Sequence, residues 1–264
     1  DQYVQNPGFG KLNWLARIGL KLLAGPMRKS DYKSAQQPDI LVANSNYVLG
    51  EINKYYNRDG VVIFPPVGVE RMRQAADKVS VGEIRKIKKE LFNDEEFYAV
   101  AGRQVNWKRF DIAVKACVKT VENLLIVGDG PEHASLVKLA SDNPHIKFLP
   151  KYNGAEEIAK YFKAAKGLIF PSLEPFGIIP VEALACGLPI LAYAKGGSAD
   201  IVEDGTNGQF FAKQTVASLA KGIKSFNVAQ YNRQQVAKTA DRFNEAVFAA
   251  AWRELLNQHC ETSL

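Results

Sequence analysis

GLIFPSLEPFGIIPVEALACGLPILAY, residues 167–193, reads as a strand, a loop, a helix and a second strand. The apolar runs GLIFP (167–171) and PILAY (189–193) indicate buried strands. The stretch between them ends in a helix-like run, which predicts a helix near residues 178–186. Parallel strands need such a crossover, so this segment favours a parallel α/β sheet.

Two glutamates, eight positions apart, flank the start of the expected helix. Pro180 is tolerated only in the first turn of a helix, and Gly187 is typical of a helix end. Glu174 therefore lies in the loop before the helix, and Glu182 lies about one turn beyond its free amides. Such an arrangement leaves a place for an anion between the two acids.

The free amides and the helix dipole predict a phosphate site at Gly177 and Ile178. Gly177 lets the backbone approach the phosphate closely, and Glu182 is suited to accept hydrogen bonds from a ribose hydroxyl pair. Glu174 then faces the group attached beyond the phosphate. Taken alone, two glutamates also fit an acid favoured by the dipole and an exposed helix residue.

The same alternation of strands and helices extends in both directions. Strand-like segments recur at FYAVAG (97–102), LLIVG (124–128), IKFLP (146–150) and GQFF (208–211), with helices expected near 109–121, from about 131 and near 155–165. Six such segments predict an α/β fold with a doubly wound, Rossmann-like parallel sheet. Upstream, ILVAN (40–44) and VVIFPPV (61–67) are expected to be strands, followed by a charged connection through about residue 95. Within it, Arg85, Lys86, Lys88 and Lys89, flanked by Glu83 and Glu90, indicate a solvated helix face.

Ligands of doubly wound sheets bind at the carboxyl ends of strands, so residues that follow the apolar runs are candidates. Arg103 and Lys108 follow the first strand, and Gly128 and Gly130 follow the second. A glycine pair, Gly196–Gly197, follows PILAY. Each loop alone is weak support, but their joint placement predicts one site.

Composition excludes several classes of protein. The 264 residues are 47% hydrophobic, as in a globular chain of one or two domains, and the net charge of +6 suits a nucleic acid, an anionic membrane or a phosphate-bearing ligand. The three cysteines and three histidines lack metal-ligand spacing, so no metal site is expected. No apolar run is long enough to cross a bilayer, and a cytoplasmic location is expected.

The spacing of Glu174 and Glu182 resembles the E-x7-E motif of retaining GT-B glycosyltransferases of glycosyltransferase family 4, the group 1 glycosyl transferases. AGR with a downstream KRxD, GDGPE, PSxxEPFGxxPxEAxAxGxPxxA, a GG pair and DGxxG follow in the family's order over about residues 97–211. Upstream, DQY, ILVANS, KYY and VVIFPPV resemble bacterial mannosyltransferases that build O-antigen and other surface polysaccharides. The resemblance implies GDP-mannose as donor and a glycan or lipid-linked glycan as acceptor.

The resemblance also implies a domain organisation. Residues 1–67 would be the remnant of an N-terminal acceptor-side domain, 68–240 the nucleotide-sugar domain, and 241–264 a helix that packs back toward the first domain. The chain begins with Asp1 and family members are longer at the front, so a further N-terminal part is expected. Residues 1–33, with Lys11, Arg17 and Lys21, suit either a basic amphipathic helix on a membrane face or an ordinary surface helix.

The resemblance assigns a role to each candidate residue. Arg103 and Lys108 would stabilise the departing diphosphate without a metal ion, and Glu174 would contact the donor sugar. The donor-binding set comprises Glu182 at the ribose, the backbone of Lys151 and Tyr152 at the base, and Phe176, Gly177, Ile178, Gly128 and Gly130 around the phosphates. Two positions depart from the family pattern: Pro150 replaces a glycine, and Asp200 replaces a glutamate.

Four alternatives follow from the same residues. A nicotinamide dehydrogenase needs GxGxxG, but His133 stands where the third glycine belongs. A truncated, non-catalytic fragment that only binds a nucleotide sugar, and a transferase that uses a UDP-sugar, stay open. A nucleic-acid binder is disfavoured because the chain lacks a repeat of aromatic and basic residues.

Overall fold

The computed structural model describes residues 13–260, and their contacts divide the chain into two compact units. Unit 1 comprises the described residues through Ala43 together with Leu49–Val62. Unit 2 comprises Asn44–Val48 and the described chain from Ile63 onward. The predicted division at residues 67/68 and 240/241 remains a prediction.

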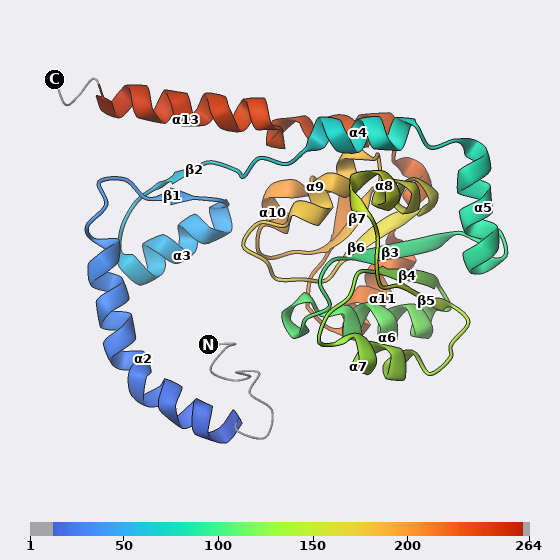
Figure 1. Cartoon of the computed structure of the whole chain (residues 1–264), viewed down its shortest axis with the longest axis horizontal. Helices are drawn as coiled ribbons and strands as arrows, with labels where there is room; N and C mark the ends of the chain where they lie inside the picture. Colours follow the sequence, from blue (N-terminus) through green and yellow to red (C-terminus); the bar gives the residue numbers. More distant parts are fainter. Residues whose placement is uncertain (1–12, 261–264) are drawn as a thin grey trace. The chain divides into compact units, whose positions relative to one another are not determined.

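Unit 2 is built on a six-stranded sheet in the order β5-β4-β3-β6-β7-β8 (Figure 1). The strands are β3 (Phe97–Ala101), β4 (Asn123–Val127), β5 (Ile146–Leu149), β6 (Gly167–Phe170), β7 (Ile190–Tyr193) and β8 (Gly208–Phe211). Each neighbouring pair is parallel. The six predicted strands and the predicted α/β fold are therefore confirmed.

Burial of the central strands explains why apolar runs form this sheet. Every residue of β3, β4 and β6 is buried, whereas the edge strands β5 and β8 are partly exposed. A strand buried on both faces requires apolar side chains at successive positions, which is the pattern seen in the sequence.

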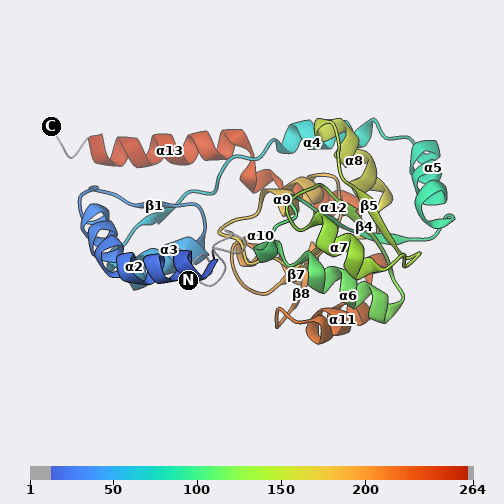
Figure 2. The ribbon, with the colours of Figure 1, turned by 60° about the horizontal axis from the view of Figure 1, so that its bottom comes forward.

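Helices cover both faces of the sheet. The helices after β3 are α6 (Phe110–Thr120), α7 (His133–Ala140), α8 (Gly154–Ala164), α9 (Ile178–Ala185), α10 (Ser198–Ile201), α11 (Val216–Ser225), α12 (Arg233–Lys238) and α13 (Glu245–Cys260). α6, α7 and α11 pack together on one face, and α8, α9 and α12 lie on the other (Figures 1 and 2). Short 3₁₀ helices complete the unit: η2 (Asn106–Lys108), η3 (Val228–Gln230) and η4 (Asp241–Phe243).

The strand order places a topological switch point between β3 and β6. From β3 the chain moves outward to β4 and β5, then returns to β6 beside β3 and moves outward again to β7 and β8. Connections leave the two adjacent strands in opposite directions, which opens a crevice at their carboxyl ends. This crevice is where a ligand is expected in an open α/β sheet.

The charged segment before β3 contains two helices, of which the second confirms the helix face expected around Glu83–Glu90 and the first was not predicted. It contains α4 (Val69–Asp77) and α5 (Val81–Phe92). Ser80 and Glu83 form a reciprocal capping box at the start of α5. α4 buries an apolar side, including Met72, and packs against α8 and α9. The charged residues on the exposed side of α4 hid this apolar pattern in the sequence.

Unit 1 contains α2 (Asn13–Ala35), β1 (Val42–Ala43), most of α3 (Asn46–Tyr56) and β2 (Val61–Val62). β1 and β2 pair in parallel and are much shorter than the predicted strands 40–44 and 61–67, which are therefore corrected. Pro65 and Pro66 lack backbone N–H groups and cannot extend β2.

The proposed membrane-facing helix is only partly described. Residue Lys11 and the side chains of Arg17 and Lys21 lie outside the described residues. Among residues 13–260, no helix is long and apolar enough to span a membrane.

Candidate active site

An ion pair occupies the switch point. Lys108, the last residue of η2 after β3, places its Nζ 2.8 Å from Oε1 of Glu174, in the loop after β6. Both side chains are largely buried, with 15% and 16% of their surface exposed. No well-directed hydrogen bond to that Glu174 oxygen is found among the described residues, so the two groups are held mainly by charge. A pair held in this way can exchange partners when another anion arrives.

Arg103 lies in the same loop as Lys108 and is exposed. Its guanidinium makes no hydrogen bond or ion pair with another residue in the described part of the chain. A guanidinium offers five N–H donors, so this group is available to an anion.

The start of α9 has the predicted geometry. Gly177 is the N-cap residue with φ of +111°, a conformation that glycine adopts without strain. Ile178 is the first helical residue and is 52% exposed, while Pro180 lies within the first turn. Gly177 is buried and Ile178 is exposed, so solvent reaches this helix start at Ile178.

Phe176, a predicted donor contact, turns its ring into the core. Only 4% of its surface is exposed, and the ring packs against Phe64 and Phe243 with centroid distances of 5.9 and 5.5 Å. A donor contact from Phe176 would therefore come from its backbone.

Hydrogen bonds join four loops at the carboxyl edge. Gln104, fully buried, donates from its side-chain amide to the carbonyl of Gly128, and its backbone N–H donates to Asp129 O at 2.9 Å. Ser172 Oγ donates to Lys108 O at 3.1 Å, and Gly197 N donates to Glu174 O at 2.9 Å. The loops after β4, β3, β6 and β7 are thus linked in that order.

Glycines allow these loops to touch through their backbones. A methyl group on Gly128 would stand 2.3 Å from Gly102 O, and one on Gly130 would stand 2.4 Å from Gln104 O. A methyl group on Gly197 would stand 2.2 Å from Phe176 O. The predicted glycine positions Gly128 and Gly130 are therefore required for loop packing, whatever they contribute to a ligand.

Glu182 and Tyr152 lie near one another at the other end of the site. Burial raises the pKa of the Glu182 carboxyl above its usual value, and the charge of Arg71 partly opposes this. Burial also raises the pKa of the Tyr152 phenol, with a further contribution from Glu182. Lys151, next to Tyr152, is exposed.

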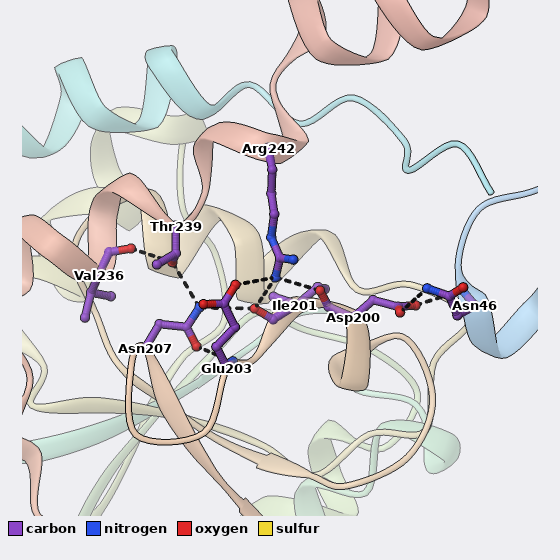
Figure 3. A network of polar contacts seen from close by, with 8 residues as sticks. All are labelled: Asn46, Asp200, Ile201, Glu203, Asn207, Val236, Thr239 and Arg242. Atoms are coloured by element: carbon purple, nitrogen blue, oxygen red, sulfur yellow. Dashed lines mark hydrogen bonds and ion pairs between the residues drawn. The ribbon is translucent and has the colours of Figure 1, made fainter. Parts of the chain in front are cut away.

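Asp200, one of the two departures from the family pattern, is held by Asn46 (Figure 3). Its carboxylate accepts hydrogen bonds from the Asn46 backbone N–H at 2.8 Å and from Asn46 Nδ2 at 2.6 Å, and both residues belong to unit 2. Arg242 donates to Asp200 O at 2.7 Å and lies 3.3 Å from Glu203 Oε1. Asp200, whose side chain is shorter than that of the glutamate in the family pattern, is therefore hydrogen-bonded to a residue of the same unit.

His133 and His145 lie beside amide side chains, and two cysteines are buried. His133 Nδ1 lies 2.9 Å from Gln104 Oε1, and His145 Nδ1 lies 2.7 Å from Asn123 Oδ1. Cys117 and Cys186 are buried and form no disulfide with each other. Within residues 13–260, no three His, Cys, Asp or Glu side chains group closely enough to hold a metal ion.

The structure brings Lys108, Glu174 and the start of α9 together at the switch point, and Glu182 with Tyr152 beside it. Sequence reasoning missed Gln104 and Arg71. The partners of Gln104 lie on another loop, so no local signal identified it; Arg71 belongs to α4, the helix that was missed.

Comparisons with known proteins show what the chain is similar to. The family profile described as "Glycosyl transferases group 1" matches residues 82–243. A D-inositol 3-phosphate glycosyltransferase from Mycobacterium sp. (strain JLS) is 28% identical over 217 residues, which are 76% of this chain and 47% of that protein. The chain thus spans about half the length of this curated relative.

Two solved structures share the fold at low sequence identity. A sucrose-phosphate synthase from Thermosynechococcus elongatus aligns with a TM-score of 0.74 at 19% identity, covering 98% of this chain and 66% of that one. HepE from Anabaena, in complex with UDP, aligns with a TM-score of 0.70 at 23% identity, covering 85% and 65%.

Proposed function

Because the chain belongs to the glycosyl transferases group 1 family, we propose that it transfers a sugar from a nucleoside diphosphate sugar to a hydroxyl group, with retention at the anomeric carbon. The observation that carries this proposal is the buried Lys108–Glu174 pair at the switch point, beside the exposed start of α9. This pair offers a cation that can bind a diphosphate and, beside it, a carboxylate that can bind a sugar.

The leaving diphosphate gains negative charge as the glycosidic bond breaks, and the site must stabilise that charge. We assign this role to Arg103, Lys108 and the amides of Gly177 and Ile178. When the donor binds, Lys108 turns from Glu174 to the phosphates, and Glu174 then accepts hydrogen bonds from sugar hydroxyls. With these positive groups, transfer needs no tightly bound metal ion.

The nucleoside is assigned to the side of the site formed by α9 and the β5–α8 loop. Glu182 accepts hydrogen bonds from the ribose hydroxyls, and the backbone of Lys151 and Tyr152 contacts the base. The Gly128–Gly130 turn approaches the phosphates from β4. The exposure of Lys151 and the nearness of Tyr152 to Glu182 support this assignment.

We propose GDP-mannose as the donor and a surface-polysaccharide glycan, free or lipid-linked, as the acceptor, because the upstream segments resemble those mannosyltransferases. The enzyme would act in the cytoplasm, with peripheral contact to the membrane. A UDP-sugar donor is the second candidate, favoured by the UDP bound to HepE, a structure of the same fold.

A thermal-shift series tests the donor class. The nucleotides are GDP-mannose, GDP, UDP-glucose, UDP-N-acetylglucosamine, ADP-glucose and NAD. A ligand at about a hundred times its dissociation constant adds roughly 2.7 kcal/mol, which corresponds to a rise in Tm of roughly 5–10 °C. We expect the largest rise with GDP ligands, lost in Glu182→Ala and Arg103→Ala.

Arg85→Ala is the matched control, because Arg85 is an exposed arginine of α5. A rise in Tm with UDP ligands alone would reject GDP-mannose as the donor and support a transferase that uses a UDP-sugar. No rise with any nucleotide sugar would overturn the proposed function. Binding without transfer to any glycan acceptor would favour the non-catalytic binding fragment.

A further inference from the structure

Arg71, like Arg103, is an arginine whose guanidinium N–H donors form no hydrogen bond within the described residues. It lies in the first turn of α4 and is exposed. Its guanidinium makes no hydrogen bond or close ion pair with another residue in the range 13–260. Arg73, two positions later, is instead engaged by Glu70 and Asp241. Arg73 thus forms ion pairs within the protein, whereas the N–H donors of Arg71 can bind a ligand.

The position of Arg71 is defined by the start of α8. One guanidinium nitrogen lies 3.6 Å from the point where a Cβ of Gly154 would stand. Arg71 also lines a cavity of about 160 Å³ together with Lys78 and Asn153. Asn153 directly follows Tyr152, so the guanidinium lies at the end of the β5–α8 loop.

Arg71 also approaches the site from the side of Glu182. α4 packs against both α8 and α9. The positive charge of Arg71 lowers the pKa of the Glu182 carboxyl, against the larger effect of burial. Arg71 therefore lies beside the start of α8 and close enough for its charge to act on Glu182.

We propose that Arg71 is a specificity-determining residue that reads the base of the donor nucleotide and favours guanine over uracil and adenine. The inference rests on the proposed function, namely a nucleoside diphosphate that lies along α9 with its ribose at Glu182. The base then extends toward Tyr152 and Asn153, where Arg71 is the nearby unpaired cation.

The preference follows from the donor pattern of arginine. A guanidinium presents two parallel N–H groups and no acceptor. Guanine offers two adjacent acceptors, O6 and N7, that match this fork. Adenine places an amino donor beside N7, and uracil offers a single acceptor on the corresponding edge.

Calorimetric titration of the full chain with GDP, UDP and ADP tests the proposal. We expect Arg71→Ala to weaken GDP binding about tenfold or more, and to leave UDP and ADP binding nearly unchanged. Arg71→Lys keeps a positive charge near Glu182 but lacks the fork, so it should lose the guanine preference as well.

Lys78→Ala is the matched control, because Lys78 lines the same cavity and its exposed amine pairs only loosely with Glu156 at 3.7 Å. It should bind all three nucleotides like the unaltered chain. An equal loss for GDP, UDP and ADP in Arg71→Ala would overturn the proposal, since Arg71 would then act on ribose or phosphate.

Glu182→Ala separates this inference from the proposed function. If GDP binding is lost in Glu182→Ala but retained in Arg71→Ala, the donor site stands and the role of Arg71 is rejected. If the unaltered chain binds no nucleoside diphosphate, both proposals fail. The melting temperature of unliganded Arg71→Ala should match that of the unaltered chain, because Arg71 is exposed and holds no partner.

Discussion

Lys108 and Glu174 define the site at the scale of single residues. Their charges are 2.8 Å apart and mostly removed from water, so each depends on the other when no ligand is present. A diphosphate would compete with Glu174 for the lysine. The strength of the pair should therefore depend on whether nucleotide is bound.

A double-mutant cycle with Lys108→Met and Glu174→Gln measures that dependence. In the unliganded chain we expect a coupling free energy of about 1–3 kcal/mol, as found for residues in contact. With saturating nucleoside diphosphate the coupling should fall, because Lys108 then pairs with phosphate. Urea denaturation with and without nucleotide gives both values.

The exposed pair Lys86 and Glu90 on α5 is the control cycle, with 73% and 63% of the side chains exposed. Its coupling should stay below about 0.5 kcal/mol in both conditions. A Lys108–Glu174 coupling that nucleotide leaves unchanged would contradict an exchange of partners.

The candidate residues named from sequence alone lie in short stretches of the chain, and their roles remain predictions. The helix start at Gly177, the two glutamates around it and the basic residues after β3 all lie within short motifs. Gln104 and Arg71 were missed because the groups beside them are remote in sequence: Gln104 bonds to Gly128, and Arg71 lies next to the start of α8. Such contacts follow from the packing of loops and helices, which no local pattern predicts.

At the scale of elements, the loops after β3 and β4 depend on glycine for two separable reasons. Gly128 has φ of +112°, and a methyl group on it would collide with the Gly102 carbonyl. Gly205 also has a positive φ, +77°, but nothing lies within 4 Å of its Cβ position. Substitution of Gly205 therefore tests backbone strain alone, whereas substitution of Gly128 tests strain and steric collision together.

Gly205→Ala should cost about 1–2 kcal/mol of stability, the strain of a left-handed alanine. Gly128→Ala should cost more, because its backbone neighbour cannot move freely, and it should also weaken nucleotide binding. Chemical denaturation and nucleotide titration of both variants test this. Equal costs at the two positions, with binding intact, would show that the close approach of the two loops is unimportant.

Prediction of elements succeeded where burial was uniform and failed where charge obscured it. β3, β4 and β6 were found because successive apolar residues mark strands that are covered on both faces, and the partly exposed edge strands β5 and β8 were found from shorter apolar runs. α4 was missed because its buried positions, such as Met72, alternate with arginines and glutamates. The predicted strands 40–44 and 61–67 were longer than β1 and β2, because apolar residues continue beyond the paired residues.

At the scale of the whole molecule, the topology gathers the candidate residues at one edge of the sheet. Every parallel strand of unit 2 ends at this edge, whatever its order along the chain. The alternation in the sequence predicted a doubly wound sheet, and the structure supplies the strand order that puts β3 beside β6. The assignment of acceptor and donor domains remains a prediction.

Hydrogen exchange should show that nucleotide binds at this edge of the sheet and not at the opposite edge. With bound nucleoside diphosphate, amides should exchange more slowly in residues 102–109, 128–133, 150–154, 171–178 and 194–198. Loops at the opposite edge, residues 143–145, 165–166 and 187–189, serve as an internal control and should be unaffected. Slowing spread evenly over both edges would indicate general stabilisation and would argue against a site at the switch point.

The placement of Arg71 on α4 has a consequence for how such a protein changes over evolutionary time. The four linked loops tolerate little variation, because backbone touches backbone at Gly128, Gly130 and Gly197. α4 is a separate surface helix, and no hydrogen bond of the linked loops involves Arg71. On this assignment a single surface substitution can alter the preferred nucleotide while the transfer machinery is inherited intact, so lineages with the same chemistry can diverge in the donors they use.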